Sequence, residues 1–218
     1  MKNLLLVAAA SIGLFGLMQG AYAEEAAPQK EVVTQSTAER YTFDKSHTQI
    51  LFFVDHLGFS KSQGEFLDYD GYFVFDRTHP EKSNVDVTIK TASVDMDSDK
   101  WDEHLKSPDF FNAEAFPDMT FKSTAIKITG EKSADITGDL TLLGVTKPVV
   151  LKVTYNKSDK HPFSGKYVSG FSATAVVKRS EFGMNYGLPG VGDDVHLRLE
   201  VEGERVEAAE APAETPAE

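Results

Sequence analysis

The sequence predicts an all-β fold of about eight strands, arranged as a sandwich or a barrel. Apolar residues recur with a period of two along most of the chain, which is typical of strands with two different faces. The strands are short and are separated by Gly and Asn or Asp residues, as in sandwiches and barrels. One strand, in residues 50–56, is apolar on both faces, whereas a strand in a small sheet usually has one solvent-exposed, polar face.

A barrel accounts for this two-sided strand better than a sandwich. One face would line the interior, since eight strands enclose enough room for side chains or one small ligand. The outer face would then be covered by a helix, a loop or a partner chain, and such a cover is compatible with a homodimer.

The first 23 residues have the features of a secretory signal peptide. Lys2 is followed by a continuous apolar run over residues 4–18, and Ala21-Tyr22-Ala23 forms a small-x-small cleavage site. A transmembrane anchor is the competing interpretation, but a spanning helix needs about 20 apolar residues. We therefore expect cleavage after Ala23 and an exported, soluble mature protein without stable membrane insertion.

The rest of the chain is expected to form one domain with polar ends. Residues 24–39 are small and polar without periodicity, which indicates a disordered lead-in. Residues 204–218 repeat Glu, Ala and Pro and predict an acidic, disordered tail. The domain would span residues 40–203. Because the chain has no Cys, its stability must come from an ordinary core.

Several segments of this domain carry the period of two clearly. Val85, Val87 and Ile89 share one face of an expected strand, and residues 135–155 predict two strands joined by a turn at 144–147. The remaining strands are expected within residues 72–76, 119–128, 167–182 and 194–203.

Residues 98–117 break the pattern. Ser98 or Asp99 can cap a short helix with acidic residues in its first turn, and Pro108 would end it. Three Phe residues follow in the loop 109–117. Because loop aromatics must pack on something, we expect a short helix and an aromatic loop that cover or flank the barrel.

Composition excludes several functions. The formal charge of −12, or −13 once Lys2 is removed with the leader, disfavours nucleic acid and an anionic membrane surface as partners. The absence of Cys excludes a thiol nucleophile, and no motif of hydrolases, zinc proteases or nucleotide-binding loops occurs. The Gly-rich residues 187–194 lack the strand–turn–helix setting of a phosphate site and predict a flexible loop.

A metal site is not expected either. The six His residues do not pair at spacings of two or four. His47 and His56 lie nine residues apart with opposite parity, so their side chains would point to opposite faces.

His56 and Arg179 are the polar candidates for ligand contact. His56 follows Ile50, Phe52 and Val54 on one strand face, so a polar tip would end an apolar lining, which suits an amphiphilic ligand. Alternatively, His56 is a core residue bonded to a backbone carbonyl. Arg179 ends a run of small residues and is either a ligand contact or a surface ion pair.

Four ordered motifs resemble the YceI-like family. They are "FDKSHTQILFFVDHLGFSKSQGEFLDYDGYFVFD", "HLKSPDFFNAEAFPDMTFKST", "ITGDLTLLGVTKPVVLKV" and "FGMNYGLPGVGDDVHLRLEVEG", and the similarity covers residues 40–203. The resemblance implies an elongated, antiparallel, lipocalin-like barrel that is exported to the bacterial periplasm. It implies a long isoprenoid ligand, such as a polyprenyl phosphate or a quinone tail, and neither catalysis nor a cofactor.

The resemblance also suggests positions for ligand contacts. The inward strand corresponds to Phe52, Val54 and His56, and the loop aromatics to Phe110 and Phe111. Trp101 departs from relatives with a basic residue before "DEHL", which implies a less anionic head group. The expected ligand-binding residues are Phe52, Val54, His56, Phe66, Phe110, Phe111, Phe121, Phe171, Arg179 and Met184.

Two other functions compete with a lipid carrier. An enzyme that modifies a lipid would use His56 as general base and would need a second titratable group, with Asp55 and Asp44 as candidates. A stress-related interaction module without a ligand would have large Phe and Leu side chains filling the barrel centre.

Overall fold

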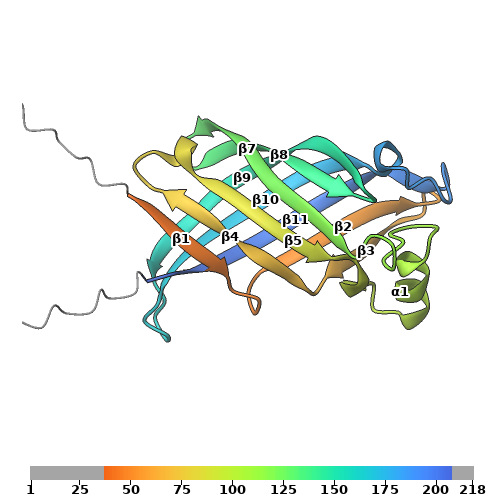
Figure 1. The fold of residues 1–218 in the computed structure, drawn as a ribbon, viewed down its shortest axis with the longest axis horizontal. Coiled ribbons are helices and arrows are strands. Elements are labelled where there is room, and N and C mark those ends of the chain that lie inside the picture. Colours follow the sequence, from red (N-terminus) through yellow and green to blue (C-terminus); the bar gives the residue numbers. More distant parts are fainter. Residues whose placement is uncertain (1–36, 208–218) are drawn as a thin grey trace, which may run out of the picture. The chain divides into compact units, whose positions relative to one another are not determined.

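The computed structural model describes residues 37–207, which form a closed antiparallel β-barrel (Figure 1). The sheet order is β1-β4-β5-β7-β8-β9-β10-β11-β2-β3-β6, and pairing of β1 with β11 closes it. The strands are β1 (Ala38–Phe43), β2 (Gln49–His56), β3 (Ser60–Phe66), β4 (Tyr69–Asp76), β5 (Asn84–Lys90), β6 (Val94–Asp95), β7 (Asp118–Gly130), β8 (Ser133–Leu142), β9 (Val145–Lys160), β10 (Tyr167–Lys178) and β11 (Val191–Arg205).

These eleven strands of the described region correspond to eight crossings of the barrel wall. β1 and β2 are consecutive pieces of one crossing, since both pair with β11: Phe43 lies opposite Gly203, and Gln49 lies opposite Glu200. In the same way β3 continues into β4, which pairs with β1, and β6 extends the line of β5. The predicted eight-stranded antiparallel barrel is therefore confirmed.

The barrel is elongated because its strands are long. β9 has 16 residues and β11 has 15, so β9 measures about 50 Å along its axis at roughly 3.3 Å per residue. Alternate residues of each strand point into the barrel, as the period of two predicts.

The segment after β6 closes one end of the barrel. Helix α1 (Asp99–Lys106) begins after Ser98 and ends before Pro108, as expected (Figure 1). Two rings of the aromatic loop, Phe110 and Phe111, are buried, and Phe111 contacts the inward-facing Phe66 with 5.4 Å between ring centroids. These rings therefore pack against the core and are not the loop cover that the outer face of β2 could have had.

Polar neighbours flank that outer face instead. Leu51 is half-buried and lies in register with Arg198 and Glu65, whose long side chains flank it.

Along the sequence, the barrel domain extends slightly beyond both of its expected boundaries. β1 begins at Ala38, inside the expected lead-in, and β11 ends at Arg205, inside the expected tail. The ladder between β1 and β11 accounts for this, because Tyr41 pairs with Arg205. The predictions for residues 1–23, 24–36 and 208–218 lie outside the described residues. Within residues 37–207, no helix has the length and apolar character that crossing a membrane requires.

Candidate ligand-binding cavity

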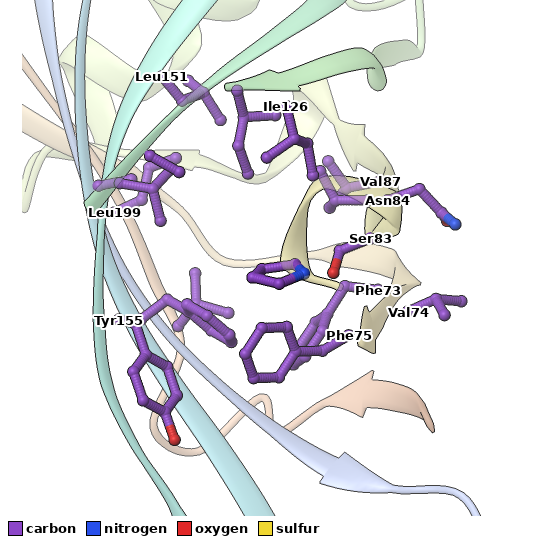
Figure 2. A pocket seen from close by; sticks show the side chains of 18 of the residues that line it. Phe73, Val74, Phe75, Ser83, Asn84, Val87, Ile126, Leu151, Tyr155 and Leu199 are labelled. Carbon is purple, nitrogen blue, oxygen red and sulfur yellow. The ribbon is translucent and has the colours of Figure 1, made fainter. Parts of the chain in front are cut away.

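An apolar cavity of about 460 Å³ lies inside the barrel (Figure 2). Its wall consists of inward side chains from every long crossing, because the strand alternation places one apolar face of each strand toward the axis. Lining residues from six different strands include Phe73, Val87, Ile126, Leu151, Phe171 and Leu199.

Four aromatic rings form one side of the cavity wall. Phe171 of β10 contacts Phe73 and Phe75 of β4, with ring centroids 5.5 and 5.1 Å apart, in edge-to-face arrangements. Tyr155 of β9 completes the group at 5.6 Å from Phe171. These rings present a large apolar surface whose geometry is fixed by mutual contact.

The cavity reaches the surface at one end, where its lining becomes polar. Arg77 follows β4 and Asn84 begins β5. Glu131 and Lys132 connect β7 to β8, which begins at Ser133. All five residues border the cavity. Adjacent antiparallel strands place these connections at the same end of the barrel, opposite α1 (Figure 1). The polar rim therefore lies at the end of the barrel remote from His56, contrary to the expectation.

The other end of the barrel is filled by side chains. Phe52 contacts Phe66 with ring centroids 5.7 Å apart, and Phe66 contacts Phe111. All three are buried in the main apolar core. The barrel thus combines a filled half near α1 with a hollow half at the polar rim.

Two of the ten predicted ligand-binding residues, Phe121 and Phe171, line this cavity. The other eight do not border it, and most of them lie in the filled half. The residues that are buried there without bordering the cavity are Phe52, Phe66, Phe110, Phe111 and Met184.

Val54 and His56 lie still nearer the closed end, on the last residues of β2. His56 pairs with Ser60 and Val191 in the ladder, is half-buried, and does not border the cavity. Among residues 37–207 its side chain has no hydrogen-bond partner, so the alternative of a carbonyl-bonded core histidine is also wrong.

The candidate partners of His56 are engaged elsewhere. The Asp55 carboxylate accepts a hydrogen bond from the Gly58 backbone at 2.8 Å, which holds the β2–β3 turn. The Asp44 carboxylate lies 2.6 Å from Nδ1 of His47. No catalytic pair therefore forms around His56 within the described part of the chain.

Arg179 is buried and does not border the cavity, so the alternative of a surface ion pair is wrong. Its guanidinium is buried and donates hydrogen bonds to the carbonyls of Gly192, Met184 and Val191, at 2.8, 3.0 and 2.8 Å. Burial lowers the pKa of Arg179, and the nearby Asp193 carboxylate opposes this shift. The expected flexible loop 187–194 is therefore tied down, and its last four residues belong to β11.

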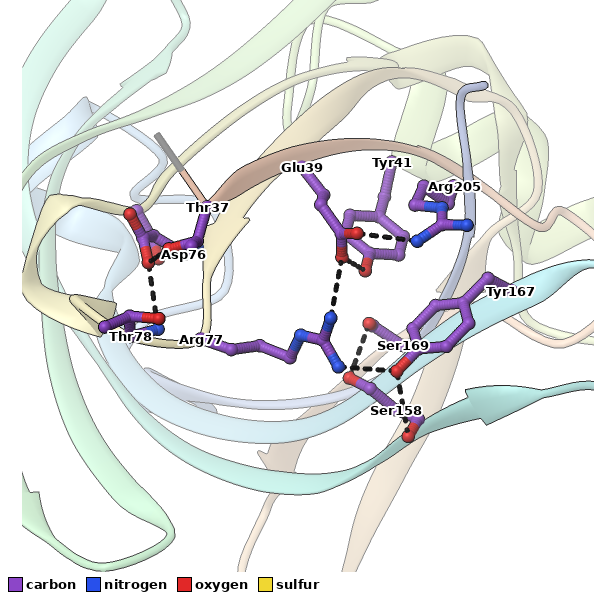
Figure 3. A network of polar contacts seen from close by, with 11 residues as sticks. Thr37, Glu39, Tyr41, Asp76, Arg77, Thr78, Ser158, Tyr167, Ser169 and Arg205 are labelled. Atoms are coloured by element: carbon purple, nitrogen blue, oxygen red, sulfur yellow. Dashed lines mark hydrogen bonds and ion pairs between the residues drawn. The ribbon is translucent and has the colours of Figure 1, made fainter. Parts of the chain in front are cut away.

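A polar network beside the cavity was missed by sequence analysis (Figure 3). The Glu39 carboxylate accepts hydrogen bonds from Arg205 at 2.6 Å and from the Tyr41 hydroxyl at 2.7 Å, and it lies 3.6 Å from Arg77. Arg77 also donates to the Tyr167 hydroxyl at 2.6 Å. The alternation of Glu39, Tyr41 and Phe43 was the available signal, but Glu39 was assigned to the lead-in and Arg205 to the tail.

This network fixes Arg77 at the cavity rim. Burial raises the pKa of Tyr41 to about 12, with the Glu39 carboxylate contributing. Burial also raises the pKa of Glu39, but the hydrogen bonds from Tyr41 and Arg205 outweigh it and the net pKa is lowered. Tyr41 stacks on Phe73 at 4.9 Å, so the network backs directly onto the aromatic wall.

Within residues 37–207, one group of side chains brings three potential metal-ligand atoms within 4.8 Å of one another. It consists of Asp44, His47 and Glu202. His47 is exposed and already paired with Asp44, and this pairing raises the pKa of His47. The group is a surface cluster whose charges partly compensate one another.

The fold and the cavity define a class of protein, the closed antiparallel barrel with an apolar interior that opens at a polar rim. Within that class the chain belongs to the YceI-like family, because a family model described as the YceI-like domain matches residues 41–203.

Named relatives and solved structures agree with this assignment. A protein of Ectopseudomonas mendocina named UPF0312 protein is 44% identical over 173 residues, which cover 78% of this chain and 90% of that protein. The crystal structure of a Campylobacter jejuni YceI protein is 36% identical with a TM-score of 0.63, covering 70% of this chain and 90% of the other.

A more distant structure shares the fold alone. It is described as a polyisoprenoid binding domain from Saccharophagus degradans, with 12% identity and a TM-score of 0.58. The similarity covers 76% of this chain and 98% of that one.

Proposed function

We propose that this protein binds an isoprenoid lipid in the barrel cavity and carries or stores it in the bacterial periplasm, without catalysing a reaction. The observation that carries the proposal is the continuous apolar cavity of about 460 Å³ that ends at a polar rim. Membership of the YceI-like family supports the ligand class, and so does the shared fold with the polyisoprenoid binding domain from Saccharophagus degradans. The apolar leader in residues 1–23 supports the compartment.

The cavity suits a ligand with an apolar chain and one oxygen-bearing head. Burying the chain contributes roughly 25 cal/mol per Å² of apolar surface, so affinity would come mainly from the hollow half. At the rim, Arg77 uses two contacts, to Tyr167 and Glu39, while a guanidinium has five N–H donors. Donors of Arg77 therefore remain for a quinone carbonyl or a phosphate oxygen.

The argument from Trp101 about the head group does not apply to this cavity. Trp101 lies on α1, is 46% exposed and stacks on His104, at the filled end of the barrel. Head-group selection would instead depend on Arg77 and the β7–β8 connection at the rim.

Native mass spectrometry of the protein purified from its own periplasm, followed by lipid extraction, tests the proposal. We expect a co-purifying isoprenoid at about one per chain. An Ala173→Trp variant, which places an indole in the cavity, should lack it, while Thr174→Trp on the outer face should retain it. An apo mass without thermal stabilisation by added quinones or polyprenyl phosphates would overturn the proposal.

The competing enzyme has a separate test. His56 lies away from the cavity, so a His56→Ala carrier should keep its lipid affinity within about twofold. Turnover of a bound lipid that is lost in His56→Ala would establish the enzyme in place of the carrier.

A further inference from the structure

The β9–β10 hairpin, residues 156–167, extends beyond the rest of the barrel wall at the end opposite α1 (Figure 1). Thr154 is the last residue of β9 in register with β8, opposite Ser133, yet β9 continues to Lys160, which pairs with Tyr167 of β10. The additional residues span about 20 Å along the strand, at roughly 3.3 Å per residue. The hairpin therefore reaches past the β7–β8 connection.

The turn at the hairpin tip holds one apolar side chain in solvent. The backbone N–H of His161 donates to the Lys166 carbonyl at 2.7 Å, and that of Gly165 donates to the His161 carbonyl at 2.9 Å. Gly165 has a φ of 74°, a conformation that glycine adopts readily. Within this turn Phe163 is 93% exposed, the highest value among the large apolar side chains of residues 37–207. The exposed ring therefore belongs to a hydrogen-bonded turn.

The base of the hairpin is tied to the cavity rim. Arg77 borders the cavity and donates a hydrogen bond to the Tyr167 hydroxyl at 2.6 Å. The Arg205 guanidinium lies over the Tyr167 ring, 4.6 Å from its centroid. Ile128, at the same rim, also borders the cavity and is 44% exposed. A surface that contacts the hairpin tip therefore lies near the opening of the cavity.

The net charge of −12 is distributed unevenly between the two ends of the barrel. The three connections at the open end, residues 77–83, 127–133 and 156–167, contain seven basic and three acidic residues. Around α1, residues 95–109 contain two basic and six acidic residues. At about 0.15 M salt, exposed charges separated by more than roughly 8 Å are largely screened. The net charge alone therefore does not decide which surface the open end contacts.

We propose that the β9–β10 hairpin docks the barrel on a membrane that contains anionic phospholipids. The Phe163 ring enters the interface between head groups and acyl chains. The flanking side chains of Lys157, Lys160 and Lys166 are exposed and contact the anionic head groups. Because a single ring enters the interface, the attachment is reversible and the cavity opening faces the bilayer. The inference goes beyond the proposed function, since docking is measured without a ligand.

Flotation with vesicles of phosphatidylcholine and about 30% phosphatidylglycerol, in about 0.15 M salt, tests the docking. Phe163→Ser should weaken vesicle binding by about fivefold or more. The matched control is Phe59→Ser, which removes an 88% exposed ring at the α1 end and should change binding by less than about twofold. Lys160→Glu should also weaken binding about fivefold or more, whereas Lys61→Glu makes the same charge change on β3 and should change it by less than about twofold.

Fluorescence shows which end of the barrel contacts the vesicle. Trp101 is the one Trp of the chain, so Trp101→Phe gives a background in which an introduced Trp is the sole emitter. In this background we expect the emission of Phe163→Trp to move to shorter wavelength and to be quenched by brominated lipids. Phe59→Trp should show neither change. Equal quenching at the two positions, or quenching of Phe59→Trp alone, would overturn the proposal.

The outcomes separate docking from the proposed function. A protein that co-purifies an isoprenoid but does not bind the vesicles would overturn docking and leave the carrier intact. A protein that binds the vesicles through Phe163 but has no co-purifying isoprenoid would support docking and overturn the carrier. Vesicle binding that Phe163→Ser and Phe59→Ser weaken equally would overturn the assignment to the hairpin.

Discussion

Ile50 and Phe52 project into the barrel from the same face of β2, but only Ile50 borders the cavity. The two residues mark the change from a hollow to a filled interior. On the hollow side the wall is apolar and ends at Arg77. On the filled side Phe52 begins a chain of aromatic contacts that continues through Phe66 to Phe111. The division allows one barrel to hold a ligand and still keep a packed core.

The fit of Phe52 over Gly64 predicts that a single methyl group at Gly64 is destabilising. In Gly64→Ala the new Cβ would lie 2.3 Å from Cζ of Phe52 and 2.9 Å from Cγ of Met96. We expect a loss of about 1–3 kcal/mol in the free energy of unfolding, measured by urea denaturation.

Gly170→Ala is the matched control, because a Cβ there would have no atom nearer than 3.8 Å. It should change the unfolding free energy by less than about 0.5 kcal/mol. Adding Phe52→Leu to Gly64→Ala should recover part of the loss. Equal losses at the two glycines would contradict the explanation.

The buried Arg179 predicts a large stability effect without any effect on the cavity wall. Arg179→Met would leave three carbonyls without their donor, and we expect a loss of about 3 kcal/mol or more. Arg179→Lys should recover only part of it, since an ammonium is a point donor and does not span three carbonyls.

The neighbouring Lys178 provides the control for Arg179, because its side chain is charged but exposed. Its exposed ion pair with Asp194 should contribute less than about 1 kcal/mol, so Lys178→Met should be nearly neutral in the same denaturation experiment. If Arg179→Met were as mild as Lys178→Met, the anchoring role of Arg179 would be wrong.

The raised pKa of Tyr41 predicts a stability change at high pH. Because the fold holds the neutral phenol, the contribution of Tyr41 is complete below about pH 10, the pKa of an unfolded tyrosine. It is lost as pH rises from there to about 12, the pKa in the fold. The near-ultraviolet phenolate signal of the native protein minus that of Tyr41→Phe should titrate near 12. A midpoint near 10 would show that Tyr41 is accessible to water.

The lowered pKa of Glu39 predicts the opposite sign at low pH. Its stabilisation is present above the ordinary value of 4.5 and is lost as pH falls through the lowered pKa in the fold. The stability difference between the native protein and Glu39→Gln should therefore be constant near neutral pH and shrink in acid. A difference that grows in acid would rule out the assigned role of the network.

The sequence predicted the barrel because strand parity is a local property. Val85, Val87 and Ile89 were assigned to one face by their spacing, and all three line the cavity. Phe121 and Phe171, which were expected among the ligand-binding residues, also border it.

The alternation of residues along a strand shows which side chains face inward, but it does not show how far along the barrel axis each of them lies. Phe52 and Phe66 face inward as expected, but whether an interior level is filled depends on rings from distant strands that meet there. The polar network was missed for a related reason. Glu39 and Arg205 stand at the ends of the barrel sequence, where charges usually indicate solvated segments, and only the β1–β11 ladder brings them together.

A crystal structure of the protein with a bound prenyl phosphate tests the central claim most directly. The account predicts the prenyl chain in the cavity between Phe121, Phe171 and Leu199, with its phosphate within hydrogen-bond distance of Arg77. A chain that lies on the outer surface, or a phosphate at the α1 end of the barrel, would contradict it.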